Sequence, residues 1–434
     1  MNTEKNLVVV GLGYVGLPLA LLAQEKGWQV TGLDVDTEKV EKINKGISPL
    51  EDAAIEQGLK DHPIAATTNA SVITKAAVMV VAVPTPVTET HEPDLGPLKS
   101  ALNSILPHLQ NGQLLSIEST INPGVMDEVV IGLLKTRSDL KLEGNDALQV
   151  VHCPERINPG DKQWTIRNIP RVIGGYTEQA TQAGKEFYES IVEAEIKPMG
   201  SLTEAEAVKI FENTFRDINI AFVNEMAKSF DKLGINVTNV IAGASTKPFA
   251  FLAHYPGNGV GGHCISVDPY YMIERARQVG FDHQFLKLAR QINDSMPQYA
   301  LELMDHGLQK LGVSDPTVAL LGLAYKKNID DVRESPCLTI RSMLEERNVN
   351  LRVFDPHVLK DSTVSSLEEA TQDAQVVIIG TNHDEFVEQL TPEFLQSHNV
   401  KLIVDGKNAL DESAIKNAGI LYYGIGRSNL VGKK

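Results

Sequence analysis

The chain has 434 residues, of which 42% are hydrophobic and 22% are charged, a composition typical of soluble globular proteins. At ~100–200 residues per domain, this length predicts two or three domains. The 56 acidic residues outnumber the 40 basic ones and give a net charge of −16. Such a chain repels phosphate polymers, so nucleic-acid binding is not expected. A small phosphorylated ligand stays open, because local backbone N–H groups and a few cations suffice for it.

No apolar run reaches the ~18 residues that a membrane-spanning helix needs, and Met1–Asn6 is polar rather than a signal peptide. We therefore expect a cytoplasmic protein without a membrane partner. The three cysteines, Cys153, Cys264 and Cys337, are a sparse and odd-numbered set that does not suggest a disulfide framework or a zinc site. The sequence thus predicts no metal and leaves room for a reactive thiol.

Short apolar runs alternate with helical patterns from the start of the chain to about residue 199. Continuous apolar runs bounded by turn residues are typical of buried parallel strands, and the alternation predicts a doubly wound α/β domain over residues 1–199. Helices are expected at Pro18–Lys26 and Thr37–Lys45. Strands are expected at Leu7–Val10, Val30–Leu33, Val78–Val83, Leu114–Ile117, Leu148–Val151 and Arg171–Gly174.

The first expected strand leads into the segment Gly11–Gly16, which reads G-L-G-Y-V-G and fits G-x-G-x-x-G. Gly11 permits a tight turn, Gly13 lets a pyrophosphate approach the backbone, and Gly16 lets the helix pack closely on the strand. The next strand ends at Asp34, whose carboxylate can accept both ribose hydroxyls and would repel a 2′-phosphate. The pattern predicts NAD rather than NADP, the alternative being a Rossmann-like fold without a dinucleotide. Lys39 lies near the adenosine or is a solvated helix charge.

Three polar clusters follow other expected strands, at Val83–Pro86, Glu118–Gly124 and His152–Arg156. Doubly wound folds bind ligands at the carboxyl ends of their strands, although ordinary turns explain the first two clusters about as well. In the third cluster, Glu155 acts as an acid or base, or it only pairs with Arg156.

From Thr203 the pattern becomes helical. Thr203–Leu233 contains neither Pro nor Gly and predicts a long helix, which begins with a capping box of Thr203 and Glu206. A second helical stretch is expected over Gln284–Leu311. Between them, Lys247–Pro269 is punctuated by Gly and Pro and is longer than structureless connections usually are, which is typical of functional loops.

Lys209, Asn213 and Arg216 lie four and three residues apart on the expected long helix, so they share one polar face. One interpretation is a solvent-facing stripe. The other is a partly buried set, because Phe and Ile residues make much of the same helix apolar. Burial would strengthen the electrostatic action of the lysine.

The long loop carries four glycines in six residues, Gly257–Gly262, followed by His263, Cys264 and, four residues later, Asp268. Glycines that admit a ligand close to the backbone, followed by a Cys, suggest a nucleophilic thiol. The alternative is a structural Cys after a flexible loop. The proximity of His263 in the sequence does not establish it as a base.

Strand-like runs return at Val318–Leu323, Leu351–Phe354, Val376–Ile379 and Leu402–Val404, and they predict a second α/β domain over residues 312–434. Lys326, Lys327 and Arg333 follow the first of these runs. They could hold phosphate charge, or they could be surface cations that Asp330 and Asp331 neutralise.

Taken in chain order, these motifs resemble those of the UDP-glucose/GDP-mannose dehydrogenase family of nucleotide-sugar dehydrogenases. The most specific part is Gly-Gly-x-Cys-x-x-x-Asp over Gly261–Asp268 together with Lys-x-x-x-Asn over Lys209–Asn213. The resemblance covers nearly the whole chain through the segments Gly11–Gly16, Val83–Pro86, Ser119–Gly124, Pro154–Glu155, Lys209–Asn213, Gly257–Asp268 and Tyr325–Pro336.

The resemblance implies two Rossmann-like doubly wound domains joined by a central long-helix region. Residues 1–199 would bind NAD, residues 200–311 would form a homodimer and contribute to catalysis, and residues 312–434 would bind a UDP sugar. The implied reaction oxidises a C6 alcohol to a carboxylate in two steps with two NAD⁺, supplying a sugar acid for surface polysaccharide. Cys264 would add to the C6 aldehyde, and the second oxidation would leave a thioester.

The resemblance also implies roles for individual residues. Lys209 and Asn213 would stabilise oxyanion character, while Asp268, Thr120 and Glu155 would place water for hydrolysis. The residues expected at the cofactor are Gly11, Gly13, Tyr14, Val15, Gly16, Asp34, Lys39, Thr85, Thr120 and Arg333. Those expected at the substrate are Glu155, Arg156, Lys209, Asn213, Arg216, Gly261 and Lys326, of which Lys326 would reach its phosphates.

Within the family, Glu155–Asp161 and the His263–Cys264 pair resemble the branch that acts on UDP-N-acetylhexosamines. Thr246–Phe249 lacks the His-Pro-Arg-Val-Asn run of UDP-N-acetylmannosamine dehydrogenases, which favours UDP-N-acetylglucosamine or its galacto epimer, the former first. Alternatives are the manno epimer and UDP-glucose. A non-enzymatic sensor of NAD and nucleotide sugar is the other class, and such a sensor would not need Cys264.

Overall fold

The computed structural model describes residues 5–50, 52–88, 93–157, 163–262, 265–347, 349–427 and 430. The chain divides into two compact units. Unit 1 consists of residues 1–212 and 270–280, and unit 2 consists of residues 213–269 and 281–434. The long helix α7 (Leu202–Leu233) contributes its first part to unit 1 and the remainder to unit 2.

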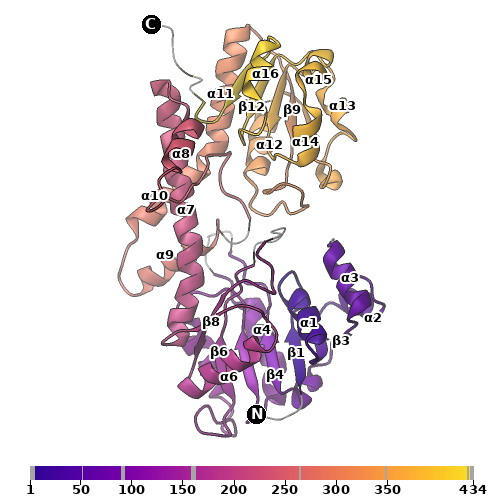
Figure 1. Cartoon of the computed structure of the whole chain (residues 1–434), viewed down its shortest axis with the longest axis vertical. Helices are drawn as coiled ribbons and strands as arrows, with labels where there is room; N and C mark the ends of the chain where they lie inside the picture. Colours follow the sequence, from indigo (N-terminus) through magenta and orange to yellow (C-terminus); the bar gives the residue numbers. More distant parts are fainter. Residues whose placement is uncertain are drawn as a thin grey trace. The chain divides into compact units, whose positions relative to one another are not determined.

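Unit 1 is built on a sheet whose described strands run in the order β3-β2-β1-β4-β5-β6-β7-β8 (Figure 1). Neighbouring strands are parallel except for the antiparallel pair β6 and β7. The order reverses between β1 and β4, which is where doubly wound sheets bind ligands. The strands are β1 (Asn6–Val10), β2 (Gln29–Leu33), β3 (Ala65–Thr67), β4 (Val78–Val81), β5 (Leu114–Ile117), β6 (Gln149–His152), β7 (Arg171–Gly175) and β8 (Ile196–Pro198).

Helices cover both faces of this sheet, because its strands are apolar on both sides. Leu7 and Val9 of β1 join a core with α1 and α6, whereas Val8 and Val10 join a core with α4, η3 and α5. The helical elements are α1 (Gly16–Glu25), α2 (Thr37–Asn44), α3 (Ala53–Asp61), η1 (Ala70–Lys75), α4 (Gly96–Ile105), η2 (Leu106–His108), η3 (Met126–Ile131), α5 (Gly132–Leu134), α6 (Glu178–Glu189) and α9 (Asp268–Gln278), of which α9 begins at the boundary with unit 2.

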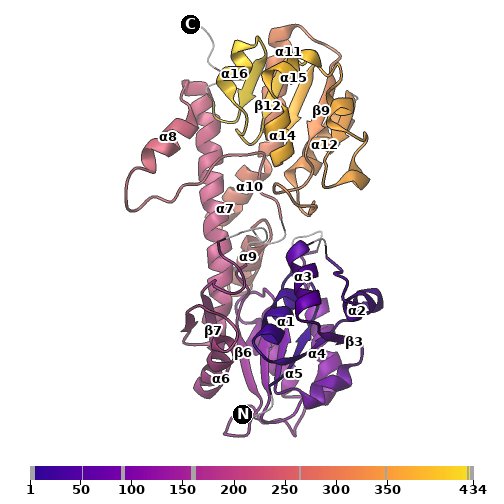
Figure 2. The ribbon, with the colours of Figure 1, turned by 45° about the vertical axis from the view of Figure 1, so that its right-hand side comes forward.

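Unit 2 holds a second, fully parallel sheet in the order β10-β9-β11-β12-β13. Its strands β9 and β12 are labelled in Figures 1 and 2. One face packs against α11 and α12, and the other packs against α13 to α16. The strands are β9 (Thr317–Leu321), β10 (Asn350–Phe354), β11 (Val376–Ile379), β12 (Leu402–Asp405) and β13 (Leu421–Gly424). The helical elements are α8 (Val237–Ala244), α10 (Gln284–Asp294), α11 (Met296–Leu311), α12 (Pro336–Glu346), η4 (Leu359–Asp361), α13 (Leu367–Thr371), α14 (Asp384–Gln389), α15 (Pro392–Ser397) and α16 (Glu412–Asn417).

The predicted pair of doubly wound α/β domains is confirmed, with three corrections of detail. β7 is antiparallel to β6 rather than parallel, since burial on both faces gives the same apolar pattern in either direction. The stretch Gln284–Leu311 is two helices that meet at Ser295, because Pro297 favours the first turn of a new helix. The α7 capping box is made by Ser201 and Glu204: Glu204 N–H donates to Ser201 Oγ, and Gly200 N–H donates to Glu204 Oε2.

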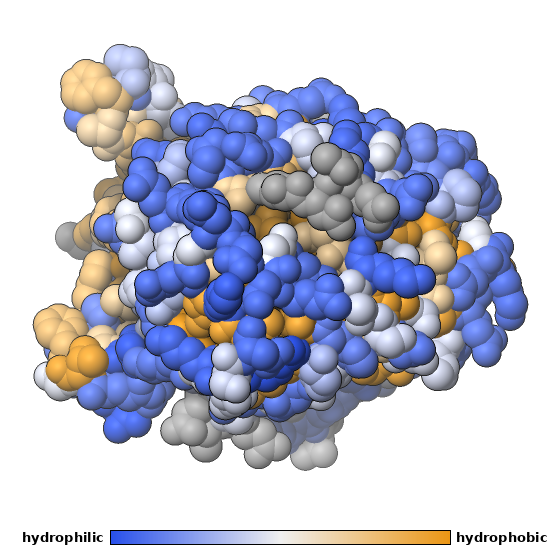
Figure 3. Space-filling model, turned by 90° about the horizontal axis from the view of Figure 1, so that it is seen from below, coloured by the Kyte–Doolittle hydropathy of each residue, from blue (hydrophilic) through white to orange (hydrophobic). Residues whose placement is uncertain are grey.

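The mix of hydrophilic and hydrophobic side chains on the surface agrees with the average composition of the chain. Figure 3 shows one face on which hydrophilic side chains dominate, with hydrophobic ones visible in patches between them. Among the described residues, none of the helices is long and apolar enough to cross a membrane.

Candidate functional site

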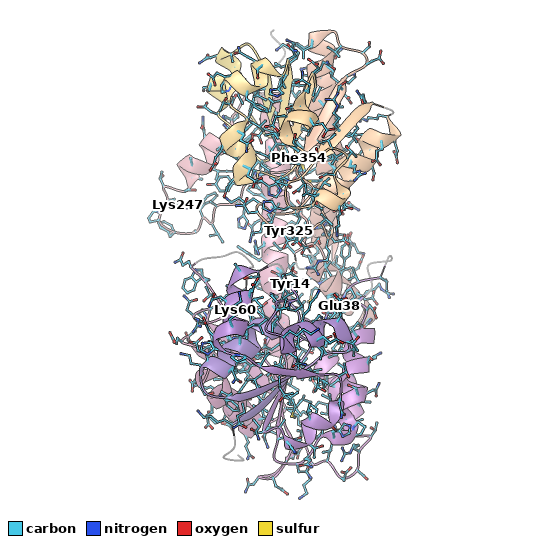
Figure 4. All side chains as sticks on the ribbon, turned by 90° about the vertical axis from the view of Figure 1, so that its right-hand side faces the viewer. Tyr14, Glu38, Lys60, Lys247, Tyr325 and Phe354 are labelled. Carbon is cyan, nitrogen blue, oxygen red and sulfur yellow. The ribbon has the colours of Figure 1, made fainter. Side chains whose placement is uncertain are left out.

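The loop after β1 has the backbone that a dinucleotide requires. Gly11 has a φ of +93°, and a Cβ at Gly16 would lie 1.9 Å from the Gly11 carbonyl oxygen, so a side chain at Gly16 would separate α1 from the strand. A Cβ at Gly13 would meet nothing within 4 Å. The backbone beside the amino end of α1 is therefore open to a pyrophosphate, and this loop fits NAD. Tyr14, labelled in Figure 4, is about half exposed in the same loop.

Asp34 is buried where β2 ends and holds the glycine loop in place. Its Oδ2 accepts the Leu12 N–H at 2.8 Å, and its Oδ1 accepts the Asp36 N–H at 3.0 Å. Lys39 Nζ lies 3.0 Å from Oδ2, so Lys39 is paired rather than merely solvated. Burial alone would raise the pKa of Asp34, but the N–H groups of Asp36 and Leu12 and the Lys39 ammonium together hold that pKa below its usual value.

The loops that follow β4 and β5 are joined by side-chain hydrogen bonds. Thr85 Oγ1 donates to the Thr120 carbonyl oxygen at 2.6 Å, and Ser119 Oγ bonds both the N–H and the carbonyl of Val83. Tyr271 of α9 donates its hydroxyl to the Thr85 carbonyl. Thr85 and Thr120 thus lie side by side at the carboxyl edge of the unit 1 sheet, next to the strand-order reversal.

Glu155 is buried in the segment after β6 and accepts the Ile157 N–H. Arg156 pairs with Glu212 instead of Glu155, so the interpretation of Glu155 as a mere partner of Arg156 is wrong. Burial raises the pKa of Glu155, and Lys209 is the strongest of the charges that oppose this rise. Glu155 and Lys209 are thus both buried in unit 1, and the ammonium group favours the ionised form of the carboxyl group.

The polar face of α7 is buried at Lys209 and Asn213, whose residues are only 7% and 6% exposed. Asn213 Nδ2 donates to Asp268 Oδ2 at 2.6 Å, which ties α7 to the first turn of α9. Arg216 is exposed, so it does not join the buried pair. The solvent-stripe interpretation is wrong for Lys209 and Asn213 and describes Arg216 correctly.

A buried chain of hydrogen bonds continues along α7 to the glycine-rich loop. The sequence analysis did not predict this chain. Arg290 Nη1 bonds Asp217 at 2.6 Å, Asn293 Nδ2 donates to Asp217 Oδ1 at 2.8 Å, and Asn224 Nδ2 donates to Asn293 Oδ1 at 2.9 Å. Asn224 Oδ1 then accepts the Gly257 N–H at 3.0 Å. Asp217 and Asn224 lie four and eleven residues beyond Asn213, so extending the helical spacing would have found them.

The glycine-rich loop packs closely against other parts of unit 2. Asn258 Nδ2 contacts the carbonyl oxygens of Ile379 and Gly380, each at 3.2 Å, where β11 ends. Gly262 has a φ of +85°, and a Cβ there would lie 2.7 Å from the ring of Tyr325, which is labelled in Figure 4. A side chain larger than hydrogen would displace the loop. His263 and Cys264 lie outside the described residues.

The other two cysteines, Cys153 and Cys337, are both buried. Burial raises the pKa of Cys153 to about 12 and also raises the pKa of Cys337. Thiols with raised pKa values are poor nucleophiles at neutral pH. Among the described residues, no group of three or more His, Cys, Asp or Glu side chains could hold a metal ion.

The loop after β9 repeats the arrangement found after β1. Asp355, which follows β10, accepts the N–H groups of Leu323 and Ala324 at 2.6 and 3.0 Å through Oδ2, as Asp34 does for Leu12. Lys327 pairs with Asp384 at 2.9 Å and Arg333 with Asp331 at 2.7 Å. Asp331 therefore neutralises Arg333, as the interpretation of these residues as surface cations predicts. Lys327 pairs with Asp384 rather than with Asp330 or Asp331.

Three family models match successive parts of the chain. The NAD binding domain of the UDP-glucose/GDP-mannose dehydrogenase family matches residues 5–192, its central domain residues 203–295, and its UDP binding domain residues 319–412. Together they span most of both units.

Individual relatives match over nearly their whole length. UDP-N-acetyl-D-mannosamine dehydrogenase of Methanococcus maripaludis is 34% identical over 96% of this chain and 95% of its own. NDP-N-acetyl-D-galactosaminuronic acid dehydrogenase of Ralstonia solanacearum is 33% identical over 91% and 95%. The solved structure of the UDP-D-ManNAc dehydrogenase of Pyrococcus horikoshii is 35% identical, with a TM-score of 0.90 over 98% of this chain and 100% of that one.

Proposed function

Because the chain belongs to the UDP-glucose/GDP-mannose dehydrogenase family, we propose that it oxidises the C6 alcohol of a UDP-N-acetylhexosamine to the uronic acid. It is an NAD-dependent nucleotide-sugar dehydrogenase with a UDP binding domain. The observation that carries the proposal is the buried face of α7, where Lys209 and the hydrogen-bonded pair Asn213–Asp268 supply a cation, an amide and a carboxylate.

In this proposal, Cys264 holds the sugar between the two oxidations. NAD⁺, which the Gly11–Gly16 loop and Asp34 would hold, would supply the hydride acceptor for each of them. The thiolate adds to the C6 aldehyde to give a thiohemiacetal, whose oxidation leaves a thioester on Cys264, and water releases the carboxylate and restores the thiol. The sum is one alcohol, two NAD⁺ and one water giving one carboxylate, two NADH and three protons.

The other residues of the proposed site stabilise charge and place water. Lys209 and Asn213 stabilise the oxyanion that develops at C6, because a fixed ammonium and a fixed amide need no reorganisation there. Asp268, Thr120 and Glu155 place the water that hydrolyses the thioester. Arg156, Arg216, Gly261 and Lys326 are proposed at the substrate, and Lys39, Thr85 and Arg333 at the cofactor.

The acetamido group of the substrate is supported by Glu155–Asp161 and by the names of the relatives. Two epimers of the UDP-N-acetylhexosamine are candidates for the substrate. The absence of the His-Pro-Arg-Val-Asn run at Thr246–Phe249 favours UDP-N-acetylglucosamine, whereas relatives named for UDP-N-acetyl-D-mannosamine favour that sugar. We propose UDP-N-acetylglucosamine as the first candidate and the manno epimer as the second.

The experiment is kcat/KM for UDP-N-acetylglucosamine, its galacto and manno epimers, and UDP-glucose. A site that pairs with the acetamide leaves that partner unsatisfied with UDP-glucose, a loss of about 1–3 kcal/mol or roughly 5- to 150-fold. A preference for UDP-glucose would refute the acetamido assignment. A preference for the manno epimer would retain the reaction and show that Thr246–Phe249 does not determine the epimer.

We also propose that the chain forms a homodimer through the central region, with 1–199, 200–311 and 312–434 as its functional regions. Phe211, Phe215 and Phe222 lie on α7 at intervals of four and seven residues, and they are 74%, 44% and 57% exposed. Large exposed aromatic side chains on one helix are typical of a protein interface. A second copy of the same helix is the proposed partner. The use of the product for surface polysaccharide stays a prediction.

A further inference from the structure

An ion pair without solvent contact lies at the edge of the unit 1 sheet where β5 ends and β7 begins. Arg171 begins β7 and Glu118 follows β5, and Arg171 Nη1 lies 3.0 Å from Glu118 Oε1 with both side chains at most 1% exposed. The Tyr188 hydroxyl donates to the same carboxylate oxygen at 2.7 Å, and the guanidinium lies 5.2 Å from the centre of the Tyr188 ring. All of these residues belong to unit 1.

The hydrogen bonds within this group do not use all of its polar atoms. Among the described residues, Glu118 Oε2, Arg171 Nε and Arg171 Nη2 are buried without a hydrogen-bond partner. A buried ion pair contributes little to stability compared with apolar side chains of the same size. Stability alone therefore does not explain why Arg171 and Glu118 form a buried ion pair here.

The order of the strands brings this ion pair and Glu155 to the same edge of the sheet. In the antiparallel pairing of β6 and β7, Val151 lies opposite Gly175 and His152 opposite Gly174. β6 ends at His152 and lies between β5 and β7 in the sheet, and β7 runs antiparallel to it. Glu118 after β5, Glu155 after β6 and Arg171 at the start of β7 therefore lie toward the same edge of the sheet. Arg171 and Glu118 both act electrostatically on Glu155, the former stabilising its charge and the latter opposing it.

Five groups among the described residues bear on the Glu155 carboxyl, and one of them is the backbone N–H of Arg156, which favours the ionised form. Lys209 of α7 and Arg171 of β7 favour its ionised form, and Glu118 favours the neutral form. On its own segment, Glu155 accepts the Ile157 N–H. The same burial that disfavours the Glu155 carboxylate also strengthens the action of each neighbouring charge.

We propose that Arg171 and Glu118 are positioning residues for hydrolysis, which together set the fraction of Glu155 that is ionised. Arg171 supplies a fixed cation that acts on Glu155, and Glu118 fixes the guanidinium and moderates its effect. The inference rests on the proposed role of Glu155 in placing the hydrolytic water.

The test compares pH profiles of kcat for the full-length enzyme and three variants. Arg171→Met removes a cation, so the acidic limb moves to higher pH and kcat on that limb falls roughly tenfold. Glu118→Gln removes an anion, so the limb moves to lower pH. Arg167→Met is the matched control, because Arg167 pairs with Glu25 on the surface and its loss leaves the limb in place.

Opposite shifts from the two halves of one ion pair are the signature of the proposal, since a general disturbance of packing would move both profiles the same way. Shifts in the same direction, or no shift, would overturn it. Arg171→Met leaves a buried carboxylate unpaired, so the double variant Arg171→Met/Glu118→Leu provides a second route. It should shift the limb by less than Arg171→Met alone, and an equal shift would contradict the role of Glu118.

The variant Glu155→Gln tests the role of Glu155 separately from the role of the ion pair. If it removes the acidic limb, the limb belongs to Glu155 and the variants above decide the role of the ion pair. If the limb persists in Glu155→Gln, the proposed role of Glu155 is wrong, and the inference about Arg171 and Glu118 falls with it. An unchanged KM for NAD⁺ in each variant shows that the dinucleotide site is intact.

Discussion

The amide of Asn213 donates a hydrogen bond of 2.6 Å to the carboxylate of Asp268, and both side chains are buried. Asp268 lies in the first turn of α9, where a negative charge interacts favourably with the helix dipole. Because the donor is an uncharged amide, it orients the carboxylate without neutralising it. This pair therefore fixes the position of one acid of the proposed site relative to α7.

Replacing Asn213 with aspartate should set two carboxylates against each other. Near neutral pH they cannot both be ionised at this distance without repulsion, so the pair should share a proton. We expect Asn213→Asp to lower kcat about 100-fold at pH 8, with partial recovery as the pH falls. Asn219→Asp is the control, since the Asn219 amide bonds the Phe215 carbonyl on the same helix. Activity of Asn213→Asp within twofold of the wild type at pH 8 would contradict the assigned geometry.

Asp34 should determine the choice between NAD⁺ and NADP⁺. Asp34→Ala should raise the KM for NAD⁺ and relax discrimination against NADP⁺, because it removes both ribose recognition and the repulsion of a 2′-phosphate. The variant also loses the acceptor of the Leu12 N–H. Asp34→Asn retains an acceptor oxygen and should retain more NAD⁺ affinity than Asp34→Ala. Equal kcat/KM for the two cofactors in the wild type would show that Asp34 does not select between them.

The raised pKa of Glu206 predicts that the stability of the folded state depends on pH. Its two oxygens accept the N–H groups of Gly124 and Met126, each at 2.7 Å, and burial raises its pKa from 4.5 to about 7. The folded state therefore binds this proton more tightly than the unfolded chain does. The resulting stabilisation is complete below about pH 4.5 and is lost as the pH rises through about 7.

Thermal unfolding of the wild type and of Glu206→Gln from pH 4.5 to 8 measures this effect. The difference in Tm between the two proteins should change in favour of the glutamine variant as the pH rises, because glutamine has no proton to lose. A difference that is independent of pH would show that Glu206 ionises alike in the folded and unfolded chain.

The exposed aromatic side chains of α7 should determine the oligomeric state. Phe211→Ser/Phe222→Ser removes two of them, and we expect the dimer to dissociate at micromolar concentrations, as measured by light scattering after size exclusion. Leu359→Ser/Val387→Ser is a matched control outside the central region, where both side chains are also exposed. A wild-type monomer, or an α7 variant that remains dimeric, would contradict the proposed interface.

The sequence predicted features that depend on neighbouring residues. The turn at Gly11, the end of β2 just before Asp34 and the long helix α7 each follow from a local pattern, and the structure confirms them. The role of Asp34 at the ribose stays a prediction. The capping box was assigned to Thr203 and Glu206 because two Ser/Thr-x-x-Glu patterns overlap there. Glu206 instead bonds N–H groups about 80 residues earlier in the chain, which no local pattern indicates.

Features that depend on distant residues were not predicted. Arg171 looks like a polar end of an apolar strand, and only the tertiary structure brings it to Glu118, 53 residues away. The partner of Arg156 is Glu212 and not the adjacent Glu155, because α7 brings a carboxylate to the guanidinium. Helical spacing could have extended the polar face of α7 to Asp217 and Asn224, but their partner Asn293 lies on another helix.

The central claim is a four-electron oxidation in which Cys264 retains the intermediate, and the ratio of NADH formed to sugar consumed tests it most directly. With limiting UDP-N-acetylglucosamine, or the preferred sugar from the panel, the wild type should form two NADH per sugar and release a uronate. Cys264→Ser should stall after partial oxidation, because a serine alkoxide is scarcely available at neutral pH. Cys153→Ser and Cys337→Ser should keep most activity. A ratio of one in the wild type, or normal turnover by Cys264→Ser, would contradict the account.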